Sequence, residues 1–137
     1  MDGIGVCARR WRVAWLCALV TSASPVLADE VPSFRKTIQP MLDTYCVSCH
    51  LQGSAPEDLV LQRGSAYRQL VGIASVQSTL KRVMPGDPQA SYLLHKLTGD
   101  QLSVGGKGVA MPFGQAQADT QLIQAVQAWI ASGAPNN

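Results

Sequence analysis

Apolar side chains recur every three or four positions in several stretches of this chain, and no segment shows sustained alternation with polar ones. The first such stretch follows Ser33, a residue type that often caps helix N-termini. Pro40 lies within this stretch and predicts a kink, because proline removes one backbone donor. We expect a helix that leads directly into Cys46 and carries its apolar residues on one face, namely Phe34, Ile38, Met41, Leu42 and Tyr45.

Three more helices are expected further along the chain. Apolar spacing predicts a short one within 67–73. Asp87 as N-cap and Pro88 at the first helical position predict the start of the next, which Gly99 ends as a C-terminal cap. The last is amphipathic and is closed by Gly133; its apolar positions are Leu122, Ile123, Val126, Trp129 and Ile130.

Long loops separate these helices. Glycine, proline and serine punctuate residues 51–64, and glycines recur through 98–114. No internal repeat is present. The predicted fold class is therefore all-α, with the helices in one domain and joined by long loops.

Residues 1–28 have the features of a cleavable secretory signal peptide. Arginines at positions 9, 10 and 12 precede the apolar run 13–20, which is far shorter than the roughly 20 residues of a spanning helix. Val26-Leu27-Ala28 then places small residues where a signal peptidase reads. An uncleaved anchor is the alternative. We expect a signal peptide at 1–28, a domain at 29–137, an exported, periplasmic location and no membrane insertion after cleavage.

Removal of this leader changes the charge and the cysteine content. Three of the 11 lysines and arginines and one of the nine acids lie in it, so the remaining chain has eight of each. That balance, with no basic patch in the sequence, argues against nucleic acid as a partner. Cys7 and Cys17 also leave, and only Cys46 and Cys49 remain.

These two cysteines belong to the run Cys46-Val47-Ser48-Cys49-His50. The pattern C-x-x-C-H is typical of a c-type haem attachment site. Two thiols at this spacing can each add to one vinyl group of a haem, which gives two thioether bonds. The histidine that follows then lies beneath the iron, where its imidazole becomes the proximal ligand. We expect one covalently attached haem c.

Two other interpretations of the motif are weaker. A redox dithiol normally follows a strand of a βαβ unit, whereas the residues before Cys46 have helical spacing. A structural zinc site needs four ligands, and the cysteines and histidines beyond the leader are Cys46, Cys49, His50 and His95 alone. Adjacent Cys49 and His50 would crowd one tetrahedral metal.

The chain beyond the leader resembles a class I c-type cytochrome domain, of the variant found in bacterial exported proteins and in planctomycete-type cytochrome c-like domains. The resemblance is carried by the helix that ends in the haem motif and by five weaker pieces in the family's order: Arg82 to Pro88, Ser91 to Leu93, Lys96-Leu97, Met111-Pro112 and Trp129 to Ala134. It implies a cytochrome c-like fold with crossing N- and C-terminal helices around the haem. It also implies electron transfer with histidine and methionine as the two axial ligands of the iron.

Met111 is the expected distal iron ligand. It lies in a glycine-rich loop that can fold over the haem, and a thioether is a soft ligand that raises the reduction potential. The alternatives are His95, which we expect mid-helix and partly exposed, Met84 in the turn before that helix, and an open site. Arg63, Lys81 and Arg82 are candidates to pair with the haem propionates, although single charges of this kind are more often simply solvated. Tyr92 and Trp129 are expected at the haem edge or the helix crossing.

The resulting hypothesis is an electron carrier rather than an enzyme, with other cytochromes, a dehydrogenase or an oxidase as redox partners. A haem enzyme or small-ligand sensor would need an open distal position with acid-base residues nearby. A haem subunit of a larger oxidase or dehydrogenase is the third interpretation. Met111-Pro112 is the feature that favours the carrier.

Cleavage after Ala28 is the first testable expectation. Mass spectrometry of the holoprotein should give a chain that begins at Asp29 and carries the mass of one haem. A chain that retains residues 1–28 would indicate a membrane anchor instead.

Overall fold

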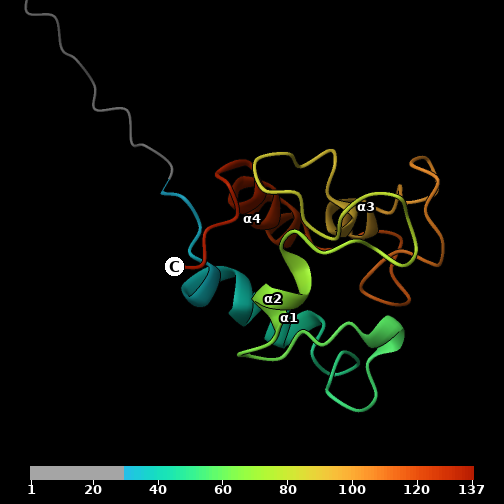
Figure 1. The fold of residues 1–137 in the computed structure, drawn as a ribbon, viewed down its shortest axis with the longest axis horizontal. Helices are drawn as coiled ribbons and strands as arrows, with labels where there is room; N and C mark the ends of the chain where they lie inside the picture. Colours follow the sequence, from blue (N-terminus) through green and yellow to red (C-terminus); the bar gives the residue numbers. More distant parts are fainter. Residues whose placement is uncertain (1–29) are drawn as a thin grey trace, which may run out of the picture.

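The computed structural model describes residues 30–137, and its regular elements are all helical (Figure 1). In chain order these are η1 (Phe34–Ile38), α1 (Gln39–Tyr45), η2 (Pro56–Asp58), α2 (Ala66–Leu70), α3 (Tyr92–Thr98) and α4 (Thr120–Ala131). Pairing between extended segments of this part is limited to isolated bridges, such as the one between Val71 and Val83. The predicted all-α class is confirmed, whereas the predicted signal peptide at 1–28 lies outside the described residues.

None of the helices within residues 30–137 is long and apolar enough to cross a membrane. The longest, α4, has twelve residues, well below the roughly 20 that a bilayer requires.

The first helical segment begins where the sequence predicted. The Ser33 hydroxyl accepts a hydrogen bond from the Lys36 backbone N–H, which caps η1. η1 is wound as a π-helix, in which the Ile38 N–H donates to the Ser33 carbonyl at 3.1 Å. Pro40 then sits at the start of α1, the position at which its missing N–H costs least. The segment ends with Cys46 as the C-terminal cap of α1.

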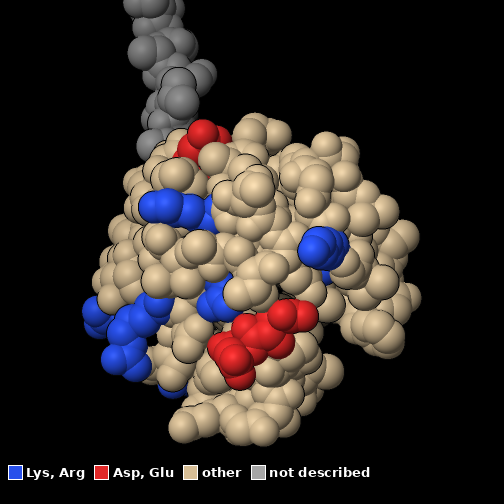
Figure 2. Space-filling view, turned by 45° about the vertical axis from the view of Figure 1, so that its right-hand side comes forward, with Lys and Arg blue, Asp and Glu red and all other residues tan. Residues whose placement is uncertain are grey.

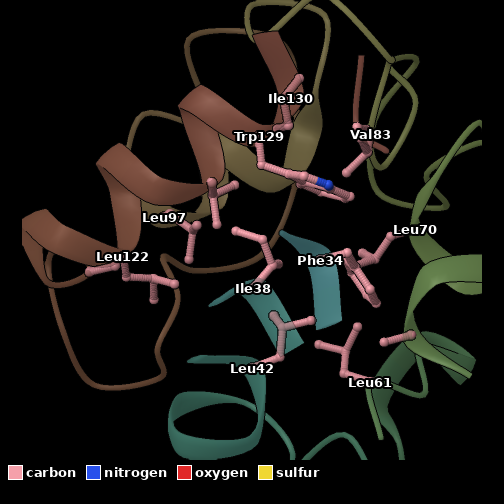
Figure 3. Close-up of a cluster of buried hydrophobic side chains, with 14 residues drawn as sticks. Phe34, Ile38, Leu42, Leu61, Leu70, Val83, Leu97, Leu122, Trp129 and Ile130 are labelled. Atoms are coloured by element: carbon pink, nitrogen blue, oxygen red, sulfur yellow. The ribbon is translucent and has the colours of Figure 1, made fainter. Parts of the chain in front are cut away.

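The hydrophobic core forms where α4 packs against η1 (Figure 3). Trp129 is fully buried, with its ring centroid 5.3 Å from that of Phe34 and 6.4 Å from that of Tyr67. Ile38 and Leu42 continue the buried face of η1 and α1. The N- and C-terminal helical segments of the described part are therefore in contact.

The end of the chain is tied back onto this core. Asn137 accepts hydrogen bonds from two backbone N–H groups at the start of η1: its side-chain oxygen from Phe34 and its backbone oxygen from Arg35, both at 2.9 Å. The Trp129 indole donates to the Pro135 carbonyl, and the Tyr67 hydroxyl donates to the Ala134 carbonyl. These bonds satisfy the polar ends of the buried Trp129 ring and the partly buried Tyr67 ring.

α3 begins later than predicted. Asp87 was expected to cap it, but its carboxylate instead accepts from the Ala90 N–H within a separate turn. The buried Ser91 hydroxyl donates back to the Asp87 carbonyl and accepts from the Met84 N–H, which holds that turn and delays the helix until Tyr92. Gly99 does cap the C-terminus, in the left-handed conformation with φ of 81°.

Two glycines of the segment 99–114 are tightly enclosed. A Cβ atom at Gly99 would overlap the Ala116 carbonyl oxygen, and one at Gly106 would overlap the Tyr92 ring. Close approach, besides backbone freedom, therefore explains glycine at these two positions.

Trp129 provides a test of this arrangement. Trp129→Ala should lower the free energy of unfolding by about 3–5 kcal/mol, because it leaves a cavity in a closely packed core. Chemical denaturation would measure the change. Gln127→Ala, at an exposed position of the same helix, should stay within about 0.5 kcal/mol of the wild type; equal effects of the two substitutions would contradict this description of the core.

Candidate functional site

The predicted site residues meet on the wall of one cavity of about 260 Å³. Cys46, Cys49, His50 and Met111 all line it, although Met111 is distant from the others in sequence. The rest of the wall is mostly apolar, and three of its leucines also belong to the hydrophobic core, namely Leu61, Leu70 and Leu97. A ligand in this cavity would thus extend the core.

The cavity reaches the surface beside exposed apolar side chains. Val76 and Phe113 both line it and are 64% and 78% exposed. Figure 2 shows a face of the molecule on which charged side chains are few and much of the surface is uncharged. Apolar side chains of the described part of the chain therefore border this opening.

One turn of backbone brings the motif residues together. After α1 ends, the N–H groups of Cys49 and His50 both donate to the Cys46 carbonyl, at 3.2 and 3.0 Å. Both cysteines are free thiols; Cys46 is partly buried and Cys49 is exposed. Burial, and to a smaller extent the neighbouring Cys49, raises the pKa of the Cys46 thiol to about 11. Cys46 is thus a protonated thiol at neutral pH.

A backbone carbonyl fixes the orientation of the His50 ring. Its Nδ1 atom lies 2.8 Å from the Leu59 carbonyl oxygen. A carbonyl can only accept, so Nδ1 carries the proton and the neutral ring keeps the lone pair on Nε2. The Leu59 carbonyl therefore fixes the orientation of the His50 ring.

The Leu59 carbonyl is presented by a strained turn. Glu57 and Asp58, in the short element η2, have φ angles of 54° and 53°, and neither is glycine. A left-handed conformation costs such residues roughly 1–2 kcal/mol each, and strain of this kind gathers at functional sites. The Leu59 N–H donates to the Pro56 carbonyl, and the Leu61 N–H donates to the His50 carbonyl. The first bond closes the turn, and the second joins it to His50 of the motif.

Met111 is held over the cavity by the end of α3. Its backbone N–H donates to the Lys96 carbonyl at 2.7 Å, and the Ala118 N–H donates to the Leu97 carbonyl at 2.7 Å. These carbonyls belong to the last turn of a helix, where no further helical N–H is available to them. Of the methionines within residues 30–137, Met111 alone lines the cavity; Met41 packs against the core and Met84 lies in the turn before α3.

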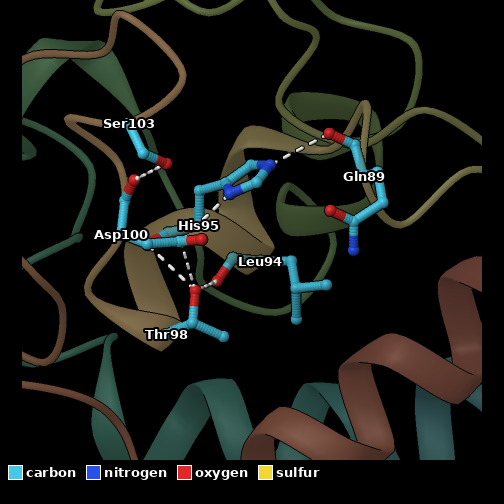
Figure 4. Close-up of polar contacts among 6 residues, drawn as sticks. All are labelled: Gln89, Leu94, His95, Thr98, Asp100 and Ser103. Atoms are coloured by element: carbon cyan, nitrogen blue, oxygen red, sulfur yellow. Dashed lines mark hydrogen bonds and ion pairs between the residues drawn. The ribbon is translucent and has the colours of Figure 1, made fainter.

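His95 is buried and fully engaged, contrary to the expectation of a partly exposed side chain (Figure 4). It is 5% exposed; its Nε2 lies 2.9 Å from the Gln89 carbonyl and its Nδ1 lies 3.0 Å from an Asp100 carboxylate oxygen. Both partners only accept when Asp100 is ionised, so both ring nitrogens then donate. Neither nitrogen has a free lone pair for a metal, and His95 does not line the cavity.

Of the three cations proposed from sequence as cofactor contacts, one lines the cavity. Arg82 does so, whereas Lys81 is exposed elsewhere and the guanidinium of Arg63 pairs with Asp43 at 2.7 Å. Tyr92 lines the cavity and Trp129 packs in the core. Sequence reasoning missed Lys96, a buried lysine on the cavity wall. Its place among the apolar residues of α3 was the available signal.

The residues present do not form a conventional protein metal site. Within the described part of the chain, no three side chains of histidine, cysteine, aspartate or glutamate gather so that they could hold a metal ion. The cavity instead offers one imidazole nitrogen, one thioether and two thiols on mostly apolar walls. This set fits a large apolar group that already supplies most of the ligands of its own metal.

Comparisons with protein-family models, with curated proteins and with solved structures find no match to this chain.

The contact between His95 and Asp100 predicts a pH-dependent contribution to stability. Burial favours a raised pKa for Asp100, but hydrogen bonds from Thr98 and His95 and the charge of His95 outweigh it and lower the pKa below 3.8. A lowered pKa stabilises the fold above the unfolded value and is lost as the pH falls through the folded one. Asp100→Asn should therefore reduce the free energy of unfolding near neutral pH by up to about 1 kcal/mol, since the pair is exposed on one side.

Denaturation with urea at neutral and acidic pH would measure this effect. The difference between wild type and Asp100→Asn should shrink as the pH falls from the ordinary carboxyl range through the lowered pKa of Asp100. Glu30→Gln, a change at an exposed residue, should have no effect at either pH. A difference that grows toward acidic pH would contradict the assigned role of Asp100.

Proposed function

We propose that this chain is an exported mono-haem c-type cytochrome with a class I cytochrome c-like fold, which carries single electrons between redox proteins. The observation that carries the proposal is that Cys46, Cys49, His50 and Met111 line the same apolar cavity. In this proposal the two cysteines attach one haem c covalently, and His50 and Met111 are the proximal and distal ligands of its iron. Haem iron supplies a centre that accepts or gives up one electron.

His50 has the properties that a proximal ligand requires. Its Nδ1–H is committed to the Leu59 carbonyl at 2.8 Å, so Nε2 is the atom left to ligate. A hydrogen bond of this kind fixes the ring plane and raises the basicity of the ligating nitrogen. The strained turn at Glu57 and Asp58 supports the role, because it holds that carbonyl in place.

Met111 favours a carrier over a catalyst. A thioether at the sixth position saturates the iron, so that it changes oxidation state without binding a substrate. The two backbone bonds from the loop to the end of α3 limit how far this side chain can move. His95, the other candidate for this position, has both ring nitrogens engaged. The His/Met pair is therefore the better-supported ligand set.

A thiol–disulfide function is disfavoured by the state of Cys46. Redox-active cysteine pairs need a thiolate, which a lowered pKa provides. Burial instead raises the pKa of Cys46 to about 11. The short loop and apolar surroundings suit a covalent attachment point better than a reactive thiol.

The exposed rim fits exchange of electrons with protein partners. Val76 and Phe113 border the cavity and remain in solvent, and exposed apolar groups beside a site mark surfaces that meet another protein. In this proposal the partners are redox proteins such as other cytochromes, a dehydrogenase or an oxidase. A haem subunit of a larger oxidoreductase would use the same surface.

The central experiment compares the iron in the wild type and in Met111→Ala. The chain is expressed with export and haem-attachment machinery, and its absorption spectrum and mass are measured. We expect covalent haem and, in the ferric wild type, the weak long-wavelength band of a methionine–iron bond. Met111→Ala should lose that band, bind carbon monoxide readily and have a lower reduction potential.

Matched variants define the outcome. Met84→Ala, at a methionine away from the cavity, should keep the wild-type spectrum, and the double change Cys46→Ala with Cys49→Ala should give a protease-sensitive chain without covalent haem. A high-spin wild type that binds carbon monoxide would replace the carrier by a haem enzyme or sensor. A low-spin Met111→Ala together with a high-spin His95→Ala would instead identify His95 as the ligand.

A further inference from the structure

Lys96 is a buried cation without a counter-ion. It is 8% exposed and lines the cavity, and its ammonium donates to the Gln77 side-chain oxygen and the Lys107 carbonyl, each at 3.4 Å. Both distances lie beyond the usual range of such bonds. Among residues 30–137, no carboxylate lies within 4.0 Å of this amine. Buried ammonium groups are costly unless they are paired, so this one lacks the partner that its environment calls for.

Arg82, which is half-buried, also lines the cavity. Its Nη1 donates to the backbone and side-chain oxygens of Gln69, at 2.9 and 3.0 Å, and its Nη2 donates to the Glu57 carbonyl at 3.3 Å. These acceptors are all uncharged, and they use three of the five N–H groups of a guanidinium. No carboxylate of the described residues lies within 4.0 Å of this side chain either. Part of its hydrogen-bonding capacity remains unused, and none of its hydrogen bonds goes to a carboxylate.

The two cations lie on one side of the cavity, around Glu57. The backbone oxygen of Glu57 accepts from Arg82. Its carboxylate accepts from the Gln77 amide at 3.1 Å, and the oxygen of that same amide accepts from Lys96. The Glu57 side chain is exposed and reaches Lys96 only through Gln77. Glu57 therefore connects the two cations without neutralising either.

Other cations of the chain show the contrast. Arg63 is 63% exposed and already paired with Asp43, and Lys81 is exposed away from the cavity. Water solvates such groups, so they need no further partner. Arg82 and Lys96 differ because burial lowers the pKa of both side chains. The charge of Glu57 opposes this effect at both residues, and the charge of Asp58 opposes it at Arg82.

We propose that Arg82 and Lys96 form a receptor for two carboxylates at one edge of the ligand in this cavity, which for haem are the two propionates. The inference rests on the proposed haem function and adds an orientation to it. A mostly apolar cavity with two cations on one side selects a ligand with an apolar body and an anionic edge. The pair would thus turn the propionate edge toward Gln77 and Glu57.

The test uses the holoprotein and four glutamine variants. Arg82→Gln and Lys96→Gln remove one charge each from the receptor; Arg68→Gln and Lys81→Gln remove the same charges from exposed side chains off the cavity. Resonance Raman bands of propionate bending report hydrogen bonds to those carboxylates. We expect these bands to shift in the first two variants only.

The midpoint potential gives a second readout. Loss of a nearby positive charge favours the ferric state, which carries one more positive charge than the ferrous state. The potential should therefore fall in Arg82→Gln and Lys96→Gln and stay near the wild-type value in the controls. If both cavity variants carry covalent haem but match the controls in bands and potential, the receptor is overturned while the haem function stands. A wild-type chain without covalent haem would overturn both.

A measurement on the wild-type protein tests the proposal even if the variants fail to fold. In the diamagnetic ferrous wild type, nuclear Overhauser contacts should join the ε-methylene protons of Lys96 to a propionate methylene of the haem. Contacts from the δ-methylene protons of Arg82 to the other propionate are expected as well. Absence of both sets of contacts in a haem-loaded protein would overturn the proposed orientation.

Discussion

Burial of Trp129 against Phe34 and Tyr67 is the interaction on which the rest of the arrangement depends. It joins the last helix to the first helical segment and fixes the direction in which α1 runs. That direction decides where α1 ends, and the turn with both cysteines and His50 starts at that end. The indole N–H and the Tyr67 hydroxyl then anchor the final residues of the chain. Packing of Trp129 against Phe34 and Tyr67 thus positions the two cysteines and His50, although these residues lie outside the aromatic contact.

Features set by short-range spacing could be predicted from the sequence. The apolar period placed Phe34, Ile38 and Leu42 on one buried face, and Ser33 and Gly99 terminate their helices as residue type suggests. Asp87 was a wrong choice of cap, because the Ser91 hydroxyl competes for the same turn. Propensity does not register such a competitor three or four residues away. The C-x-x-C-H motif and Met111 were identifiable as single residues; their convergence on one cavity required the fold.

Features that depend on tertiary contacts could not be predicted from the sequence. Nothing in the sequence indicates that a carbonyl nine residues after His50 holds its ring, since every residue has a carbonyl and only the turn selects Leu59. Lys96 and His95 lie on adjacent positions of one helix, and both are buried. They have different surroundings, one at the cavity and one between Gln89 and Asp100. Charged residues on a short helix are normally solvated, so burial of two neighbours was unexpected.

The enclosed glycines at positions 99 and 106 have a consequence for the loop that carries Met111. A glycine-rich segment usually suggests a hinge, but here the absent side chains let backbone and aromatic ring touch. The segment is therefore stiff at these two points. Met111 lies on this segment, and hydrogen bonds from the Met111 and Ala118 backbone N–H groups hold it to the end of α3. For a centre that gains and loses charge, as we propose, a stiff mounting means that few atoms must relocate at each transfer. Little reorganisation energy is then added to the barrier, and the exchange can be fast in both directions.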